Sequence, residues 1–123
     1  MITYQMVGTN KYEEAVAFYD ALLAELGAGR FMEEEGQFVA WATSPDAPSF
    51  SVTKPHDKKP ATVGNGVMTA FGAKNPEHVQ ALYDKAISLG ATDEGAPGPR
   101  GEHFYAAYCR DLDGNKFNFF CMV

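Results

Sequence analysis

The chain has 123 residues, 46% of them hydrophobic, and a formal net charge of -6 at pH 7. This length suffices for one compact unit with a real core, or for two small halves, but it excludes two large domains. The acidic balance without a basic patch argues against a nucleic-acid partner and favours a small-molecule ligand.

The first half of the chain is typical of a strand, a helix and three further strands. Residues 2–7 form an apolar-rich run that predicts the first strand. Asn10 with Glu13 matches a capping box, so we expect a helix to start at Asn10 and to stop at Gly27. The apolar stripe of this helix comprises Tyr12, Val16, Tyr19, Leu22, Leu23 and Leu26. The three strands are expected at residues 30–34, 38–43 and 50–54.

After this half, the same order of elements begins again. Residues 56–66 are polar and rich in proline and glycine, which predicts a linker. A strand is expected at residues 67–71, and Asn75 followed by Pro76 predicts the start of a second helix. The stripe of that helix comprises Val79, Leu82, Ala86 and Leu89. A Gly- and Pro-rich stretch follows at residues 95–101.

The last twenty residues predict a β-hairpin. Asp113-Gly114 between two aromatic-rich runs is a strong turn signal, and Gly114 suits the left-handed position of a three-residue loop at residues 112–114. Tyr108 then lies opposite Asn118, because side chains alternate along a strand. We expect Phe117, Phe119 and Cys121 to be buried, and Tyr108, Asn118 and Phe120 to form a pocket wall on the other face.

Two offsets relate the halves to each other. A shift of 64 residues places Tyr4 on Met68, and a shift of 67 residues places Ser51 on Asn118. The second shift also places Trp41 on Tyr108. We therefore predict an α+β fold made of two βαβββ modules, at residues 1–55 and 67–123, within a single domain of residues 1–123.

The order of elements and the segment RDLDGNK at residues 110–116 resemble the vicinal oxygen chelate superfamily, which includes glyoxalase I, extradiol dioxygenases and bleomycin-resistance proteins. The resemblance implies curled sheets around one cavity, with metal ligands on the first and last strands of each module. Carried onto this chain, the ligand positions are Tyr4, Ser51, Met68 and Asn118. The family usually has His or Glu there, and none of these four is a strong metal ligand.

The side chains expected to face the cavity are mainly apolar and aromatic, which suits a pocket that binds by contact area and orients its ligand through a few hydrogen bonds. Trp41 and Tyr108 need partners for their donors, which favours a cavity over simple filling of space between two sheets. The expected ligand-binding residues are Tyr4, Met6, Trp41, Ser51, Met68, Tyr108, Asn118 and Phe120.

The basic residues of two loops allow two interpretations. Lys54, His56, Lys58 and Lys59 lie on the linker, and Arg100 lies on the Gly- and Pro-rich loop. They are either simply solvated, or they form a cationic mouth for an acidic small molecule.

Three hypotheses for function follow. The first is a glyoxalase-like or bleomycin-resistance-like protein that binds a small organic molecule without a metal or other cofactor. The second is a lyase or dioxygenase that acts either through a divalent metal cofactor held by atypical ligands or through Tyr and His acid/base chemistry. The third is a structural dimer with a filled cavity.

The surroundings of the protein can also be anticipated. Half-open sheets leave edges to cover, which favours a homodimer. Neither end carries a signal peptide or a long apolar run. We therefore expect a cytoplasmic protein without membrane contact, in which Cys109 and Cys121 are reduced.

Overall fold

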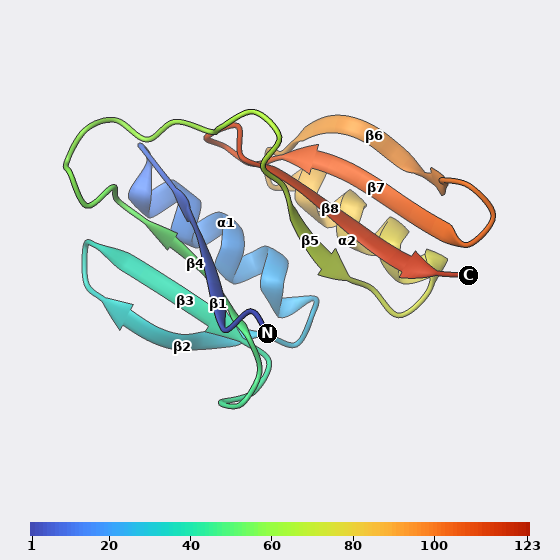
Figure 1. The fold of residues 1–123 in the computed structure, drawn as a ribbon, viewed down its shortest axis with the longest axis horizontal. Helices are drawn as coiled ribbons and strands as arrows, with labels where there is room; N and C mark the ends of the chain where they lie inside the picture. The colour runs from blue at the N-terminus through green and yellow to red at the C-terminus, as the bar shows by residue number, and fades with distance from the viewer. The chain divides into compact units, whose positions relative to one another are not determined.

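The computed structural model describes all 123 residues, which divide into two compact units at residues 1–63 and 64–123. Each unit contains one helix and one four-stranded mixed sheet, in the order strand, helix, three strands (Figure 1). The predicted α+β arrangement of two βαβββ modules is confirmed. Neither helix is long and apolar enough to cross a membrane.

The sheet of the first unit has the strand order β1-β4-β3-β2. Strand β1 runs parallel to β4, and the other neighbouring pairs are antiparallel. The elements are β1 (Tyr4–Gly8), α1 (Tyr12–Ala24), β2 (Gly29–Glu34), β3 (Phe38–Ala42) and β4 (Ser49–Thr53).

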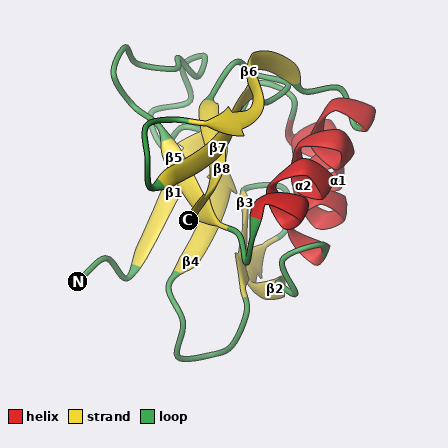
Figure 2. Ribbon diagram, turned by 90° about the vertical axis from the view of Figure 1, so that its right-hand side faces the viewer, coloured by secondary structure: helices red, strands yellow, loops and turns green.

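The sheet of the second unit repeats this topology with the order β5-β8-β7-β6, again with a parallel pair at its start. Strands and helices are coloured separately in Figure 2. The elements are β5 (Thr69–Gly72), α2 (Pro76–Ser88), β6 (Thr92–Pro99), β7 (Phe104–Arg110) and β8 (Lys116–Met122).

In each unit the helix buries its apolar stripe against one face of the sheet. In the first unit, the ring of Tyr19 on α1 packs against Trp41 and Phe50, with ring centroids 5.9 and 4.8 Å away. In the second unit, Val79, Leu82 and Ala86 on α2 are fully buried, as are Phe117 and Phe119 on β8. The face of each sheet that points away from its helix is called the distal face below.

The hairpin prediction is confirmed in detail. Tyr108 pairs with Asn118 and Cys109 with Phe117. Gly114 has a φ of 92°, a backbone conformation that residues other than glycine rarely adopt. The burial of Phe117, Phe119 and Cys121 also agrees with the expectation.

The register of the strands supports the internal repeat, with one correction. Met6 pairs with Ser51, and the equivalent pair in the second unit is Ala70 with Asn118, so both predicted shifts hold for the first and last strands. The third strands are offset by one residue more than predicted. Ala40 pairs with Ser51 in the first unit, and Tyr108 pairs with Asn118 in the second. The counterpart of Tyr108 is therefore Ala40 and not Trp41.

Two local predictions are wrong. Helix α1 begins at Tyr12, and its N-cap residue Lys11 makes no side-chain capping hydrogen bond, so Asn10 and Glu13 form no capping box. Asn10 instead binds the backbone of Ala61 twice, donating from Nδ2 to the carbonyl and accepting from the amide. The Gly- and Pro-rich stretch belongs mostly to strand β6, whose pairing with β7 shifts register twice.

Candidate functional site

The distal face of the first unit carries three of the predicted ligand-binding residues. Phe50 on β4 packs against α1, so its neighbour Ser51 points the other way, because side chains alternate along a strand. Met6 lies beside Ser51 in the parallel register, and Tyr4 lies two residues earlier on the same face. The pairing of β1 with β4 therefore brings Tyr4, Met6 and Ser51 together.

These three residues line a pocket of about 540 Å³. Ser51 is buried, whereas Tyr4 and Met6 keep 64% and 47% of their surface exposed, so apolar side chains are available to a ligand. The volume lies within the range of small-molecule sites. The pocket is lined by Thr3, Tyr4, Met6, Phe31, Met32, Phe38, Ala40, Pro45, Asp46, Ala47, Ser49 and Ser51.

Trp41 lies on the opposite side of this sheet, so its assignment to the pocket face is wrong. It is 2% exposed and packs with Tyr19 and Phe50 in the core. Its indole N–H donates to Oδ1 of Asp20 on α1 at 2.8 Å. The donor that suggested a cavity is thus satisfied by a helix carboxylate.

Asp20 forms a polar cluster with Arg30 at the edge of this core. The guanidinium of Arg30 donates to both carboxylate oxygens of Asp20, at 3.0 and 2.7 Å. These bonds, and then the bond from Trp41, hold the pKa of Asp20 below its ordinary value, although partial burial acts in the other direction.

The distal face of the second unit carries Tyr108, Asn118 and Phe120. Asn118 is 1% exposed, and its Oδ1 atom has no hydrogen-bond partner. Phe120 stacks on Phe104 with ring centroids 5.0 Å apart. A buried amide oxygen without a partner within the protein is costly.

Met68 precedes β5 and lies in a separate pocket of about 340 Å³ in the second unit. The other lining residues are Gly64, Asn65, Gly66, Val67, Arg110 and Lys116. Met68 therefore lies beside the start of β8, near cationic side chains.

The residues at the family's ligand positions do not fit a divalent metal ion. Tyr4 and Ser51 offer a phenol and a hydroxyl, and Met68 and Asn118 offer a thioether and an amide. None is a carboxylate, imidazole or thiolate, the groups that hold zinc and similar ions. No group of three or more His, Cys, Asp or Glu side chains in the chain is placed to hold a metal ion.

The structure shows the surroundings of Cys109, His78 and His103. Burial raises the pKa of Cys109 to about 12, so its thiol is protonated at neutral pH. His78 accepts a hydrogen bond from the amide of Lys74 at the start of α2, and His103 is an exposed residue beside Glu102.

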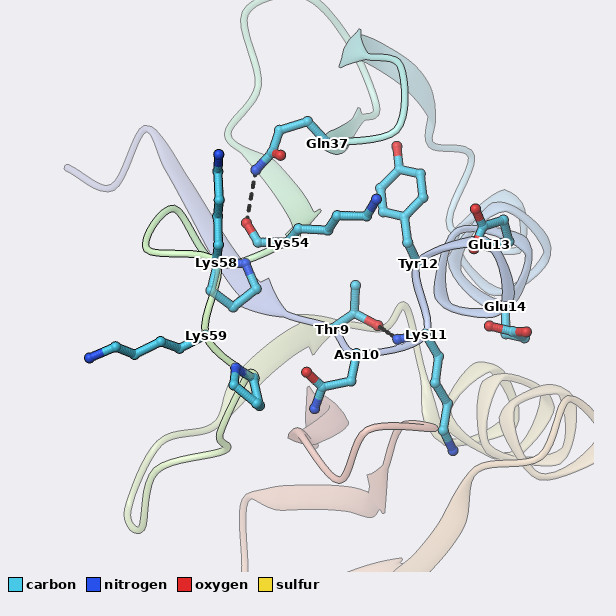
Figure 3. Close-up of a pocket in the computed structure, with 12 residues that line it drawn as sticks. Thr9, Asn10, Lys11, Tyr12, Glu13, Glu14, Gln37, Lys54, Lys58 and Lys59 are labelled. Atoms are coloured by element: carbon cyan, nitrogen blue, oxygen red, sulfur yellow. Dashed lines mark hydrogen bonds between the residues drawn. The ribbon is translucent and has the colours of Figure 1, made fainter.

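A pocket of about 780 Å³ lies where the linker meets the start of α1 (Figure 3). Lys54, Lys58 and Lys59 line it, together with Lys11, whereas His56 does not. The ammonium group of Lys54 lies 5.3 Å from the ring centre of Tyr12. Figure 3 shows that the other lysine side chains point in different directions, so they do not converge on one anion.

Sequence reasoning missed part of the pocket on the first unit. Phe38 and Ala40 lie on the distal face, and the alternation with buried Val39 and Trp41 was the signal that could have placed them. Phe31 and Met32 come from β2, where a register shift between Arg30 and Met32 obscures the alternation.

Comparisons with known proteins agree with this architecture. Residues 2–119 match the family model described as the glyoxalase/bleomycin resistance protein/dioxygenase superfamily. A glyoxalase/bleomycin resistance protein from Albidiferax ferrireducens T118 is 39% identical, with a TM-score of 0.88, and the match covers 98% of this chain and 97% of that one.

More distant structures share the fold. A glyoxalase/bleomycin resistance protein/dioxygenase family enzyme from Burkholderia phytofirmans PsJN is 22% identical, with a TM-score of 0.80 and 98% of each chain covered. A lactoylglutathione lyase from Agrobacterium tumefaciens is 18% identical, with a TM-score of 0.69, and 98% of this chain and 92% of that one are covered. No curated protein matches the chain.

Proposed function

Since the chain belongs to the glyoxalase/bleomycin resistance protein/dioxygenase superfamily, we propose that it binds a small organic molecule on the distal faces of its sheets, without a metal ion. The observation that carries this proposal is the pocket of about 540 Å³ on the first unit. The pocket surrounds Tyr4 and Ser51, two of the positions at which the family resemblance implies metal ligands.

Contact area is the main source of affinity in this proposal. Tyr4, Met6, Phe31 and Met32 each expose between 45% and 64% of their surface around the pocket. Covering apolar surface contributes roughly 25 cal/mol per Å², so a ligand that covers these side chains gains a substantial free energy. Ser51 and Tyr4 supply hydroxyl groups that orient such a ligand.

The metal-free part of the proposal rests on the chemistry of the side chains. A divalent ion must lose part of its hydration shell, and a phenol, a hydroxyl, a thioether and an amide provide too little negative charge to compensate. A zinc titration followed by calorimetry is therefore expected to show no tight stoichiometric binding. Tight binding that is lost in Tyr4→Phe or Asn118→Leu would contradict the metal-free part of the proposal.

Ligand binding itself can be tested with indole, a neutral aromatic probe, and protein labelled with ¹³C at the methionine methyl groups. We expect indole to shift the methyl signals of Met6 and Met32, which line the pocket, and not that of Met122. Met6→Gln should weaken binding about fivefold, because roughly half of a methionine side chain's burial energy is lost.

Met122→Gln is the matched control, because Met122 is another exposed methionine and does not line the pocket. It should leave the affinity for indole unchanged. If indole up to its solubility shifts neither Met6 nor Met32, the pocket is not a ligand site and the proposal fails.

A further inference from the structure

The Gly- and Pro-rich end of β6 holds one arginine against the distal face of the second unit. The guanidinium of Arg100 donates to the carbonyl oxygens of Ala96 and Pro99, at 2.8 and 3.2 Å. Its Cζ lies 5.5 Å from the ring centre of Tyr108, within the range of a cation–π contact. Local backbone groups and an aromatic ring thus fix the position of this cation.

Two glycines make room for this arrangement. A Cβ at Gly98 would lie 3.2 Å from Nη1 of Arg100, and a Cβ at Gly95 would lie 3.2 Å from Nη2. Both distances are tighter than ordinary van der Waals contact, so alanine at either position would require the guanidinium to shift by a few tenths of an ångström. The absence of side chains at these positions allows Arg100 to lie on the sheet.

A second cation reaches the same tyrosine from the neighbouring strand. Nζ of Lys116 on β8 lies 5.6 Å from the ring centre of Tyr108. In the strand order β5-β8-β7-β6, Arg100 follows β6 on one side of Tyr108, and Lys116 lies on the other side. Lys116 is two residues before Asn118, so both side chains are on the distal face.

These two cations have no acidic partner in their own unit. The ion pairs of the second unit involve His103 with Glu102 and Arg110 with Glu94, and neither includes Arg100 or Lys116. Of the five N–H groups of a guanidinium, two in Arg100 donate to backbone carbonyls, which leaves others for a ligand. The positive charge is notable in a chain with a net charge of -6.

We propose that the distal face of the second unit binds an organic acid whose carboxylate lies at Arg100, within the positive field of Lys116, and whose hydroxyl donates to Oδ1 of Asn118. A carboxylate matches the planar donors of arginine, and the hydroxyl satisfies the buried amide oxygen that has no partner within the protein. This inference rests on the proposed function and names the chemical class of its ligand, a hydroxycarboxylate with an apolar body.

Three related probes separate charge, hydroxyl and apolar contact. Mandelate carries all three features, mandelamide lacks the charge, and phenylacetate lacks the hydroxyl. In amide and side-chain NMR titrations at pH 7, mandelate should shift the signals of Tyr108 and of the Asn118 side-chain amide. Its affinity should be about tenfold higher than that of mandelamide, because hydrogen bonds to charged groups are roughly twice as strong as neutral ones.

Three variants assign these contributions. Lys116→Gln should reduce the preference for mandelate over mandelamide. Gly98→Ala should reduce it as well without changing the charge of the protein, because the added methyl group displaces the guanidinium. Asn118→Leu should abolish the preference for mandelate over phenylacetate and retain the preference over mandelamide.

Matched controls are Lys85→Gln, which removes an equal charge on α2, and Gly29→Ala, at a position where a Cβ would meet nothing within 4 Å. Both should bind the probes as the parent protein does. The inference is overturned if mandelate does not bind, binds no tighter than mandelamide, or keeps its preference in Lys116→Gln and Gly98→Ala. In each of these cases, shifts of Met6 and Met32 by indole would still support the proposed function.

Discussion

The polar side chain of Asp20 stabilises the core of the first unit through its hydrogen bonds. It accepts one hydrogen bond from the buried indole of Trp41 and two from Arg30. The side chain of Asp20 is only partly exposed, which limits competition from water. Trp41 is therefore fixed by the helix that covers it, and this explains its absence from the distal face.

Replacing Asp20 by alanine should lower the free energy of unfolding by about 2 kcal/mol, because the buried N–H of Trp41 loses its acceptor. Urea denaturation followed by the fluorescence of this single tryptophan measures the change. Glu14→Ala, which removes an exposed carboxylate from the same helix, should change it by less than about 0.5 kcal/mol. Equal effects of the two substitutions would show that the Trp41 bond contributes nothing.

The lowered pKa of Asp20 predicts that the free energy of unfolding depends on pH in the acidic range. Arg30, and then Trp41, hold the pKa of Asp20 low in the folded state. The stabilisation is therefore present above the ordinary carboxyl pKa of about 3.9, which applies to the unfolded state. It is lost as the pH falls through the lower pKa of the folded state. Asp20→Asn should be less stable than the parent protein at pH 7, and the difference should shrink towards pH 2.

The starts of the two helices look alike in sequence and differ in structure. Asn75 has extended backbone angles, and its side chain accepts from the amide of His78 at 2.9 Å, as a helix cap does. Asn10 lies before the true N-cap, Lys11, and holds residue 61 through two hydrogen bonds. Asn75 therefore stabilises a helix end, and Asn10 anchors the linker.

Substitution of these asparagines by alanine should separate the two roles. Asn75→Ala should cost about 1 kcal/mol, the usual value of a helix cap, and speed hydrogen exchange in the first turn of α2. Asn10→Ala should speed exchange at the amide of Ala61 and leave the amides of α1 unchanged. Faster exchange throughout α1 in Asn10→Ala would show that Asn10 does cap that helix.

At the scale of the whole molecule, each unit has a natural reporter of its own core. The single tryptophan belongs to the first unit, and both cysteines lie on the hairpin of the second. Cys109 and Cys121 are 0% and 5% exposed, and burial raises the pKa of Cys109 to about 12. The core of the second unit thus shields both thiols from reagents.

We expect neither thiol of the native protein to react with a disulfide reagent at pH 8, and both to react after unfolding in urea. In the unfolded state the thiol of Cys109 has a pKa of about 8.5, and above that pH its ionisation favours the unfolded state. Stability should therefore fall as the pH rises towards the folded-state pKa of about 12. A count of reactive thiols with and without urea checks the first statement. One rapid equivalent in the native protein would mean that a cysteine is accessible.

Several features of the fold were determined by the sequence alone because their signals are local. The hairpin register follows from a short loop with Gly114 at its left-handed position, which fixes how Tyr108 meets Asn118. The cap of α2 follows from Asn75 and Pro76 in the same way. Family membership was also evident from the sequence, since the order of elements and the turn at residues 110–116 resemble known members.

Other features were decided only by tertiary structure. The connection between β3 and β4, residues 43–48, is longer than a two- or three-residue hairpin loop, although it contains a hydrogen-bonded turn from Ser44 to Ala47. Only the pairing of the strands placed Ala40 beside Ser51 and turned Trp41 into the core. The pocket exists because β1 pairs with β4, more than forty residues along the chain, which places Met6 beside Ser51. Contacts between distant segments leave no local signal, and for this reason the sequence suggested the residues of the site but not all of their faces.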